Sequence, residues 1–158
     1  MASPNQSPSQ STSSSPTPPT RRSPRNPGYV LATHAVNAMA EKKASDITIL
    51  DLRGISGMAD FFVIGTGSSD LQIRAIANGV RDEIEETCDE RPWKEEGTDA
   101  LQWVLLDYVD LVVHVFTPEK RSHYDIERLW GEASSETVPD DGDASDVELL
   151  QTLMRRGD

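Results

Sequence analysis

The turn Gly65–Asp70 comes closer to a catalytic motif than any other stretch of this chain. Its sequence, Gly-Thr-Gly-Ser-Ser-Asp, separates an apolar run from an amphipathic one, and free backbone N–H groups in such a turn can bind phosphate. It has neither the Lys-Ser/Thr ending of a P-loop nor the full dinucleotide-binding fingerprint. A nucleotidyltransferase also needs paired carboxylates on a following strand to hold metal, and no Asp-x-Asp is found there. We therefore expect a plain turn that caps a helix, and keep a nucleotide-binding enzyme as the alternative function.

Side chains that could act as nucleophile, base or metal ligand are scattered along the chain. The three histidines, His34, His114 and His123, are not joined by an E-x-x-H or H-x-x-x-H spacing. The single cysteine, Cys88, cannot form a disulfide framework or a zinc cluster. We therefore expect no enzymatic activity, no cofactor and no metal. His114 lies in an apolar run, where a buried structural histidine is the usual case.

Trp103, Leu105 and Asp107 form a second candidate site, of a different kind. Residues two apart on a strand share a face, so the three side chains should lie in one row. A tryptophan flanked by an apolar residue and an acid is typical of a protein-binding hot spot, in which the carboxylate pairs with Arg or Lys of the partner. A core tryptophan followed by a turn-forming aspartate explains the same spacing, so both interpretations stay open.

Two apolar runs, Trp103–Leu106 and Leu111–Phe116, must position these residues. They are too short to span a membrane and too rich in valine for a helix. We predict two adjacent strands, covered on both faces by helices. The break between them contains Tyr108-Val109, where a two-residue hairpin would favour Gly or Asn, so a longer connection is an alternative.

Periodicity in the rest of the chain supplies the covering elements. A polar–apolar period near 3.6 predicts helices, and β-branched runs predict strands. Helices are expected at about 29–43, 70–90 and 117–130, and strands at 47–52 and 60–66, with a short edge strand or turn at 94–98. This order indicates a single α/β domain.

The two ends differ in composition from the middle of the chain. Of residues 1–27, fifteen are Ser or Pro and none is acidic, which predicts a disordered tail. We expect the folded domain at 28–133, followed at 134–158 by an acidic tail in which a short helix could form after Ser145. That helix either docks on the domain or stays part of a fraying tail, and we expect the tail. No apolar run reaches transmembrane length and no signal peptide is evident, so a bacterial cytoplasm is expected. The Ser- and Arg-bearing first segment leaves an organelle matrix after import as the alternative.

The charge limits the class of partner. The net charge of −12 divides into +3 on residues 1–27, −6 on 131–158 and −9 on the middle. An acidic domain repels phosphate backbones, so direct nucleic-acid binding is disfavoured. The acidity suits either a basic protein partner or a cytosol rich in salt. That it merely aids solubility is an equally good explanation.

The middle of the chain, from Val30 to Ala133, resembles the ribosomal silencing factor family, also called Iojap-like. The resemblance is carried by a series of short motifs in family order and spacing: Asp60-Phe-Phe-Val-Ile, Gly65-x-Gly-x-Ser before Ala75-Ile-Ala, Glu96-Gly97, Trp103-Val-x-Leu-Asp107, Asp110-x-x-Val-His114-Val-Phe and Arg121-x-x-Tyr124-x-x-Glu-x-Leu-Trp130. One departure is Val109, where the family usually has Gly.

The resemblance implies a mixed β-sheet with flanking helices, of nucleotidyltransferase-like topology but without the metal carboxylates. It implies a non-enzymatic factor that binds the large ribosomal subunit through protein fourteen of that subunit. Such a factor sterically blocks joining of the small subunit and represses translation in starvation. Homodimers off the ribosome are common in the family. On this basis we expect Trp103, Leu105 and Asp107 to form the docking centre, with Glu96 and Gly97 beside them.

Overall fold

The computed structural model describes residues 26–157. The expected disordered tail at 1–27 therefore lies outside the described residues, apart from Asn26 and Pro27. Within residues 26–157, no helix is long and apolar enough to cross a membrane.

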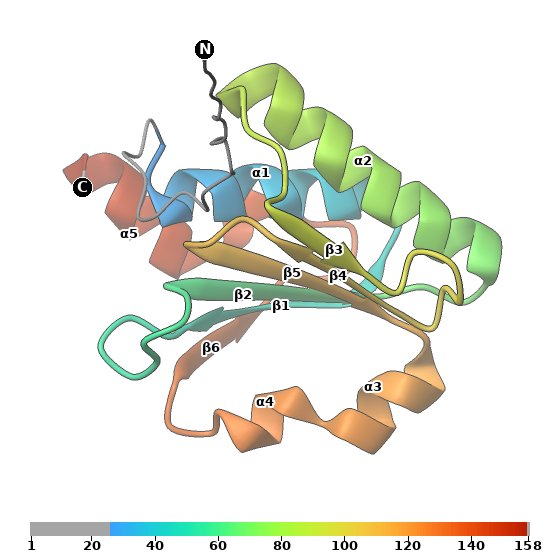
Figure 1. The fold of residues 1–158 in the computed structure, drawn as a ribbon. Coiled ribbons are helices and arrows are strands. Elements are labelled where there is room, and N and C mark those ends of the chain that lie inside the picture. The colour runs from blue at the N-terminus through green and yellow to red at the C-terminus, as the bar shows by residue number, and fades with distance from the viewer. Residues whose placement is uncertain (1–25, 158) are drawn as a thin grey trace, which may run out of the picture.

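Six strands form one mixed sheet. In chain order they are β1 Ser45–Asp51, β2 Phe61–Thr66, β3 Lys94–Glu96, β4 Trp103–Asp107, β5 Leu111–Phe116 and β6 Ser134–Thr137. Their order across the sheet is β3-β4-β5-β2-β1-β6 (Figure 1), with β2 and β5 parallel and the other neighbouring pairs antiparallel. The sheet confirms the predicted α/β domain with a mixed sheet and the predicted pairing of β4 with β5. The likeness to nucleotidyltransferases stays a prediction.

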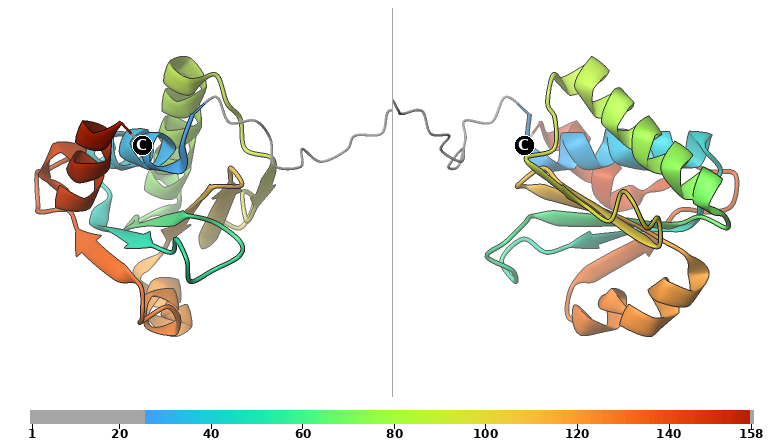
Figure 2. Two further views of the ribbon diagram at one scale, coloured as in Figure 1. Left: turned by 90° about the vertical axis from the view of Figure 1, so that its left-hand side faces the viewer. Right: turned by 45° about the vertical axis from the view of Figure 1, so that its right-hand side comes forward.

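Helices lie on both faces of the sheet. Their bounds are α1 Gly28–Glu41, α2 Asp70–Cys88, α3 Pro118–Tyr124, α4 Ile126–Leu129 and α5 Glu148–Arg156, with a 3₁₀ turn at Ala144–Asp146. Figures 1 and 2 show α1, α2 and α5 on one face and the short helices α3 and α4 on the other. The two faces are therefore covered very unequally.

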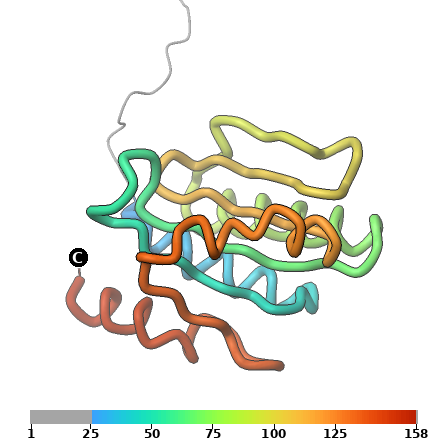
Figure 3. The backbone as a smooth tube through the Cα atoms, turned by 90° about the horizontal axis from the view of Figure 1, so that it is seen from below, coloured from blue at the N-terminus to red at the C-terminus, as the bar shows by residue number. Residues whose placement is uncertain are grey.

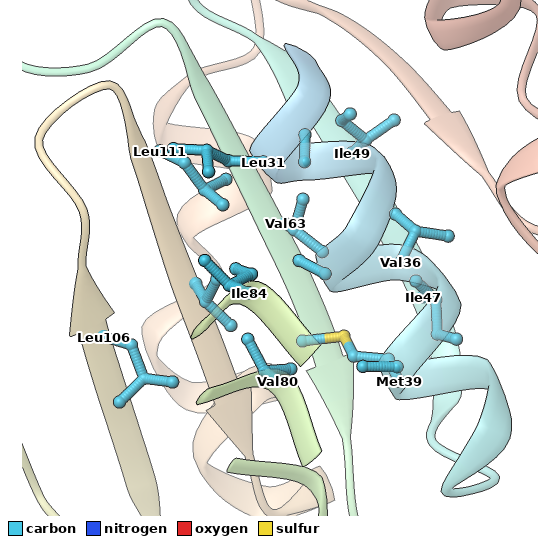
Figure 4. Close-up of a cluster of buried hydrophobic side chains, with 14 of the residues drawn as sticks. Leu31, Val36, Met39, Ile47, Ile49, Val63, Val80, Ile84, Leu106 and Leu111 are labelled. Carbon is cyan, nitrogen blue, oxygen red and sulfur yellow. The ribbon is translucent and has the colours of Figure 1, made fainter. Parts of the chain in front are cut away.

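The larger core lies between the sheet and the helices α1, α2 and α5. The predicted stripe of α2 is buried there, including Ile73, Val80 and Ile84, against β-branched and leucine side chains of the sheet (Figure 4). A smaller core on the other face contains Phe62, Phe116 and Ile126. Figure 3, a view from below, shows α3 and α4 running under the middle of the sheet, with β3 and β4 extending beyond them.

The third predicted helix is broken in two. Its beginning is as expected, because the Thr117 hydroxyl accepts a hydrogen bond from the Lys120 N–H at 3.1 Å and Pro118 is the first helical residue. Asp125, however, has a φ of +46°, which ends α3 and starts α4 in a new direction. The expectation of one continuous helix over 117–130 is wrong for this reason.

The expectation of a tail from residue 134 is also wrong. β6 pairs with β1, and the residues after it place Val138, Val147, Leu150 and Leu153 in the larger core. The carboxylate of Glu136 accepts hydrogen bonds from the first two N–H groups of α5, at 3.0 and 2.7 Å. A nine-residue helix is marginal alone, but it is stabilised here by an apolar face buried on α1. The folded domain thus extends to Arg156.

Candidate protein-docking face

An open strip of sheet lies where α3 and α4 do not reach. Along β4 the side chains of Trp103, Leu105 and Asp107 are half-buried, and they alternate with the fully buried Val104 and Leu106. The expectation that both central strands are covered on both faces holds for β5, whose residues are all buried. It is wrong for β4, because the short helices leave Trp103, Leu105 and Asp107 half-exposed on one face of the strand, although Tyr124 of α3 contacts Trp103.

The edge strand β3 adds charged side chains to the same strip. Glu96 lies opposite Leu105 and Lys94 opposite Asp107 in the antiparallel register, so these four side chains point to one face. We call the group Lys94, Glu96, Gly97, Trp103, Leu105 and Asp107 the open face. It contains all five residues that the sequence predicted as a docking centre. The structure brings them together on two adjacent strands.

Trp103 is neither sealed in a core nor free. Its indole N–H donates a hydrogen bond to Nδ1 of His114 at 3.1 Å. One ring face stacks on Phe116, with centroids 4.8 Å apart and planes 27° apart, and the ring also contacts Tyr124 at a centroid distance of 4.6 Å. The part of the indole that these contacts leave uncovered faces solvent. This geometry is compatible with both interpretations that the spacing allowed, a core tryptophan and a docking residue.

Asp107 stabilises a turn, and its carboxylate is also partly exposed to solvent. Its Oδ1 accepts a hydrogen bond from the Val109 N–H at 2.8 Å, which is the turn-forming role considered for it. The Asp110 N–H donates to the Tyr108 carbonyl at 3.0 Å, and Val109 between them has a φ of +77°. At the centre of this three-residue turn a glycine would adopt the positive φ without strain, whereas the β-branched Val109 does not. The half-exposed carboxylate of Asp107 keeps acceptor capacity for a partner.

Gly97 is needed because the chain passes very close to Trp103. Its φ is +79°, and a Cβ added to it would lie 1.9 Å from the carbonyl oxygen of Trp103. Beside it, the exposed Glu96 pairs with Lys94 at 3.2 Å across the strand surface. An exposed pair of this kind is weak, so Glu96 can exchange Lys94 for a cation of a partner at little cost.

Two further residues contact Trp103, of which the sequence predicts His114 to be a buried structural histidine. His114 is 4% exposed, and burial lowers the pKa of its ring to about 3, so it is neutral near pH 7. Tyr124, at the end of α3, is 47% exposed and continues the aromatic surface outward from Trp103. The sequence separation of 21 residues between Trp103 and Tyr124 gave no signal of this contact, which depends on where α3 folds back.

The Gly65–Asp70 turn is explained by packing and helix capping. A Cβ on Gly65 would lie 2.7 Å from the sulfur of Met39, and one on Gly67 would lie 2.8 Å from a side-chain carbon of Ile73. The Ser69 hydroxyl accepts a hydrogen bond from the Gln72 N–H, and the Gln72 side chain accepts one from the Ser68 N–H. The backbone N–H groups of Gly67, Ser68 and Gln72 are therefore already used, in agreement with the capping interpretation.

Comparison with known proteins identifies relatives of this chain. The family model described as "Ribosomal silencing factor during starvation" matches residues 25–154. A ribosomal silencing factor of Bacillus subtilis is 46% identical over 99 residues, which are 63% of this chain and 83% of the relative. A mouse relative, named "Mitochondrial assembly of ribosomal large subunit protein 1", is 29% identical over 67% of this chain, and this chain spans about half its length (51%).

A solved structure shares the fold. The crystal structure of protein CV0518 from Chromobacterium violaceum superposes with a TM-score of 0.62 at 35% identity, over 65% of this chain and 84% of that one. The family match covers nearly all of the described residues, including β6 and most of α5. The chain therefore belongs to the ribosomal silencing factor family.

Proposed function

We propose that the open face docks on the large ribosomal subunit, through protein fourteen of that subunit, and sterically blocks joining of the small subunit. Translation is then repressed in starvation or stationary phase. Membership of the family supports the ribosomal partner. The name of the mouse relative supports the choice of the large subunit. The protein would act in a bacterial cytoplasm, as the Bacillus relative suggests, or in an organelle matrix as the alternative.

The observation that carries the proposal is the half-exposed indole of Trp103, on the face of β4 that the short helices α3 and α4 leave partly uncovered. Binding energy in protein interfaces concentrates in a few aromatic and arginine side chains, surrounded by contacts that exclude water. Trp103 and Leu105 supply such an apolar centre, and Glu96 and Asp107 flank it. The two acids would steer a basic partner and fix its register.

Inhibition then follows from occupancy alone. A rigid domain on the subunit surface keeps the other subunit away for as long as it stays bound, so binding affinity converts into inhibition by mass action. This mechanism needs no catalytic group. It is consistent with a Gly65–Asp70 turn whose donors and glycines already serve packing and capping.

Binding to purified large subunits tests the proposal directly. Trp103→Ala should lower affinity by about 2 kcal/mol or more, about thirtyfold, in co-sedimentation. Leu71→Ala is the matched control, because Leu71 is 74% exposed on α2, behind the sheet, and should bind like the original protein. Adding small subunits should show that the bound factor prevents their joining. A Trp103→Ala variant that is folded and binds with unchanged affinity contradicts the proposal.

Three further measurements address the alternative function, the oligomeric state and the choice of partner. A rise in melting temperature with nucleotide and magnesium would favour the enzyme that uses the Gly65–Asp70 turn; we expect no such rise. Sedimentation equilibrium measures the proposed homodimer off the ribosome. Protein fourteen in isolation should compete with large subunits for the open face, and failure to compete would contradict that choice of partner.

A further inference from the structure

We propose that His114 is a positioning residue for docking, because its ring nitrogen selects the one orientation of the Trp103 indole that faces the partner. The inference rests on the proposed function of the open face and adds to it a buried residue that no partner could touch. His114 lies on β5, opposite Leu105 in the register and diagonal to Trp103. Its buried side chain contacts Trp103 from the neighbouring strand.

The hydrogen bond fixes the chemical state of the histidine. An indole N–H can only donate, so Nδ1 of His114 must be the unprotonated acceptor and Nε2 must carry the proton. Since burial holds the pKa of the ring near 3, the acceptor is present throughout the physiological range. Nε2 has no hydrogen-bond partner among the residues that the structure describes. The ring thus satisfies Trp103 while its own second nitrogen stays unpaired.

The histidine ring itself is held firmly. The ring of Phe62 packs edge-on against it, with centroids 4.6 Å apart, and Phe116 lies parallel to it within 9° at 6.0 Å. With 4% of its surface exposed, His114 has little room to turn away from Trp103. The acceptor is therefore a fixed point in the sheet, not a mobile surface group.

Ring stacking alone does not fix the orientation of the Trp103 indole. Phe116 stacks on the indole and Tyr124 contacts it at a tilt of 44°, and such apolar contacts depend little on where the N–H edge lies. The hydrogen bond to His114 is directional and requires the N–H edge to lie on the side of His114. A side chain that is already held in its binding orientation loses less freedom when the complex forms.

A pair of variants separates this role from simple packing. His114→Leu removes the acceptor at similar volume, whereas His114→Asn keeps an acceptor oxygen near the position of Nδ1. We expect His114→Leu to weaken binding to large subunits about two- to tenfold, and His114→Asn to recover part of that loss. In a Trp103→Phe background, which lacks the indole N–H, His114→Leu should have no further effect on binding. An equal loss in both backgrounds would show a general structural role and overturn the inference.

An NMR readout keeps the test independent of binding and of whether the variants fold. In the original protein the indole N–H of Trp103, assigned by its loss in Trp103→Phe, should exchange slowly with solvent, and His114→Leu should speed its exchange. Fast exchange in the original protein would overturn the inference without any variant at His114. If Trp103→Ala binds normally while the indole N–H is protected, the proposed docking face fails and the hydrogen bond stands as structure only.

Discussion

Replacing Gly97 by alanine tests whether β3 approaches Trp103 as closely as the structure has it. Two separate costs arise at this position. The backbone has a φ of +79°, which an alanine adopts only with strain, and the new Cβ would lie 1.9 Å from the Trp103 carbonyl oxygen. Gly54 offers a matched control, since its φ is +80° and no atom lies within 4 Å of the position of its Cβ.

The two costs can be estimated separately. Strain from the left-handed backbone is about 1–2 kcal/mol, and alanine recovers about 0.4–1 kcal/mol by restricting the unfolded chain. Gly54→Ala should therefore cost about 1 kcal/mol or less. In Gly97→Ala the carbonyl must also move, and β3 is tied to β4 by only three residue pairs. If that short ladder separates, each lost hydrogen bond adds about 1 kcal/mol, so a total near 3–4 kcal/mol is expected.

Urea unfolding of both variants provides the comparison. The free energy of unfolding should fall by about 2–3 kcal/mol more in Gly97→Ala than in Gly54→Ala, the cost of separating the ladder. Binding to large subunits should also weaken in Gly97→Ala alone, because Glu96 leaves its place opposite Leu105. Equal losses of stability in the two variants would refute the close approach, and with it the placement of Glu96 on the open face.

Three further changes test other details. Val109→Gly should raise the free energy of unfolding by about 0.5–1 kcal/mol in urea titrations, since it removes the backbone strain of a β-branched residue at a φ of +77°. A loss of stability would contradict the turn. Tyr108→Phe should leave stability unchanged or raised in the same assay, because the buried Tyr108 hydroxyl has no partner among residues 26–157; a loss above about 1 kcal/mol would contradict this. Burial lowers the pKa of His114 from 6.5 to about 3, so only the unfolded chain takes up its proton as the pH falls between these values. The free energy of unfolding should therefore fall as the pH is lowered through that window, by up to about 1.4 kcal/mol per pH unit from this residue. His114→Leu should make the free energy depend less steeply on pH. Equal slopes in the two proteins would contradict a buried neutral ring.

The elements that the sequence predicted well are those whose signal is local. The stripe of α2 and the apolar run of β5 each need burial on a face that their own periodicity reveals. The cap at Thr117 and the turn role of Asp107 are likewise set by side chains within three residues. Such features depend little on the rest of the fold, so one sequence suffices to find them.

The features that were missed depend on contacts distant along the chain. β6 is polar in composition, and the short helix expected after Ser145 is marginal alone. The stability of these two elements comes from a strand partner and from α1, neither of which periodicity can show. The break at Asp125 has no glycine to mark it. The contacts of Trp103 with His114 and Tyr124 arise only once the strand register and the position of α3 are known. The row Trp103, Leu105 and Asp107 could be found, but not which of its two interpretations applied.

The open face exists because α3 is held elsewhere. The guanidinium of Arg121 donates to the Asp46 carbonyl and the Thr66 hydroxyl at 2.7 and 2.8 Å, and to the Thr48 hydroxyl at 3.1 Å. These contacts place α3 at the ends of β1 and β2, on the far side of β5 from β3. Together with the break at Asp125, they prevent one long helix from covering Leu105.

The open face beside an edge strand creates a risk of association with other copies of the protein, and the charged residues of β3 reduce that risk. An edge strand with exposed apolar neighbours invites pairing with other copies, and natural sheets counter this with short, charged edges. β3 has three residues, Lys-Glu-Glu, all exposed. The same Glu96 that would guide a basic partner therefore also discourages association through the edge. On the open face, solubility and the choice of a basic partner are therefore compatible explanations of the acidity. The carboxylate of Glu96, close to the half-exposed indole of Trp103, serves both.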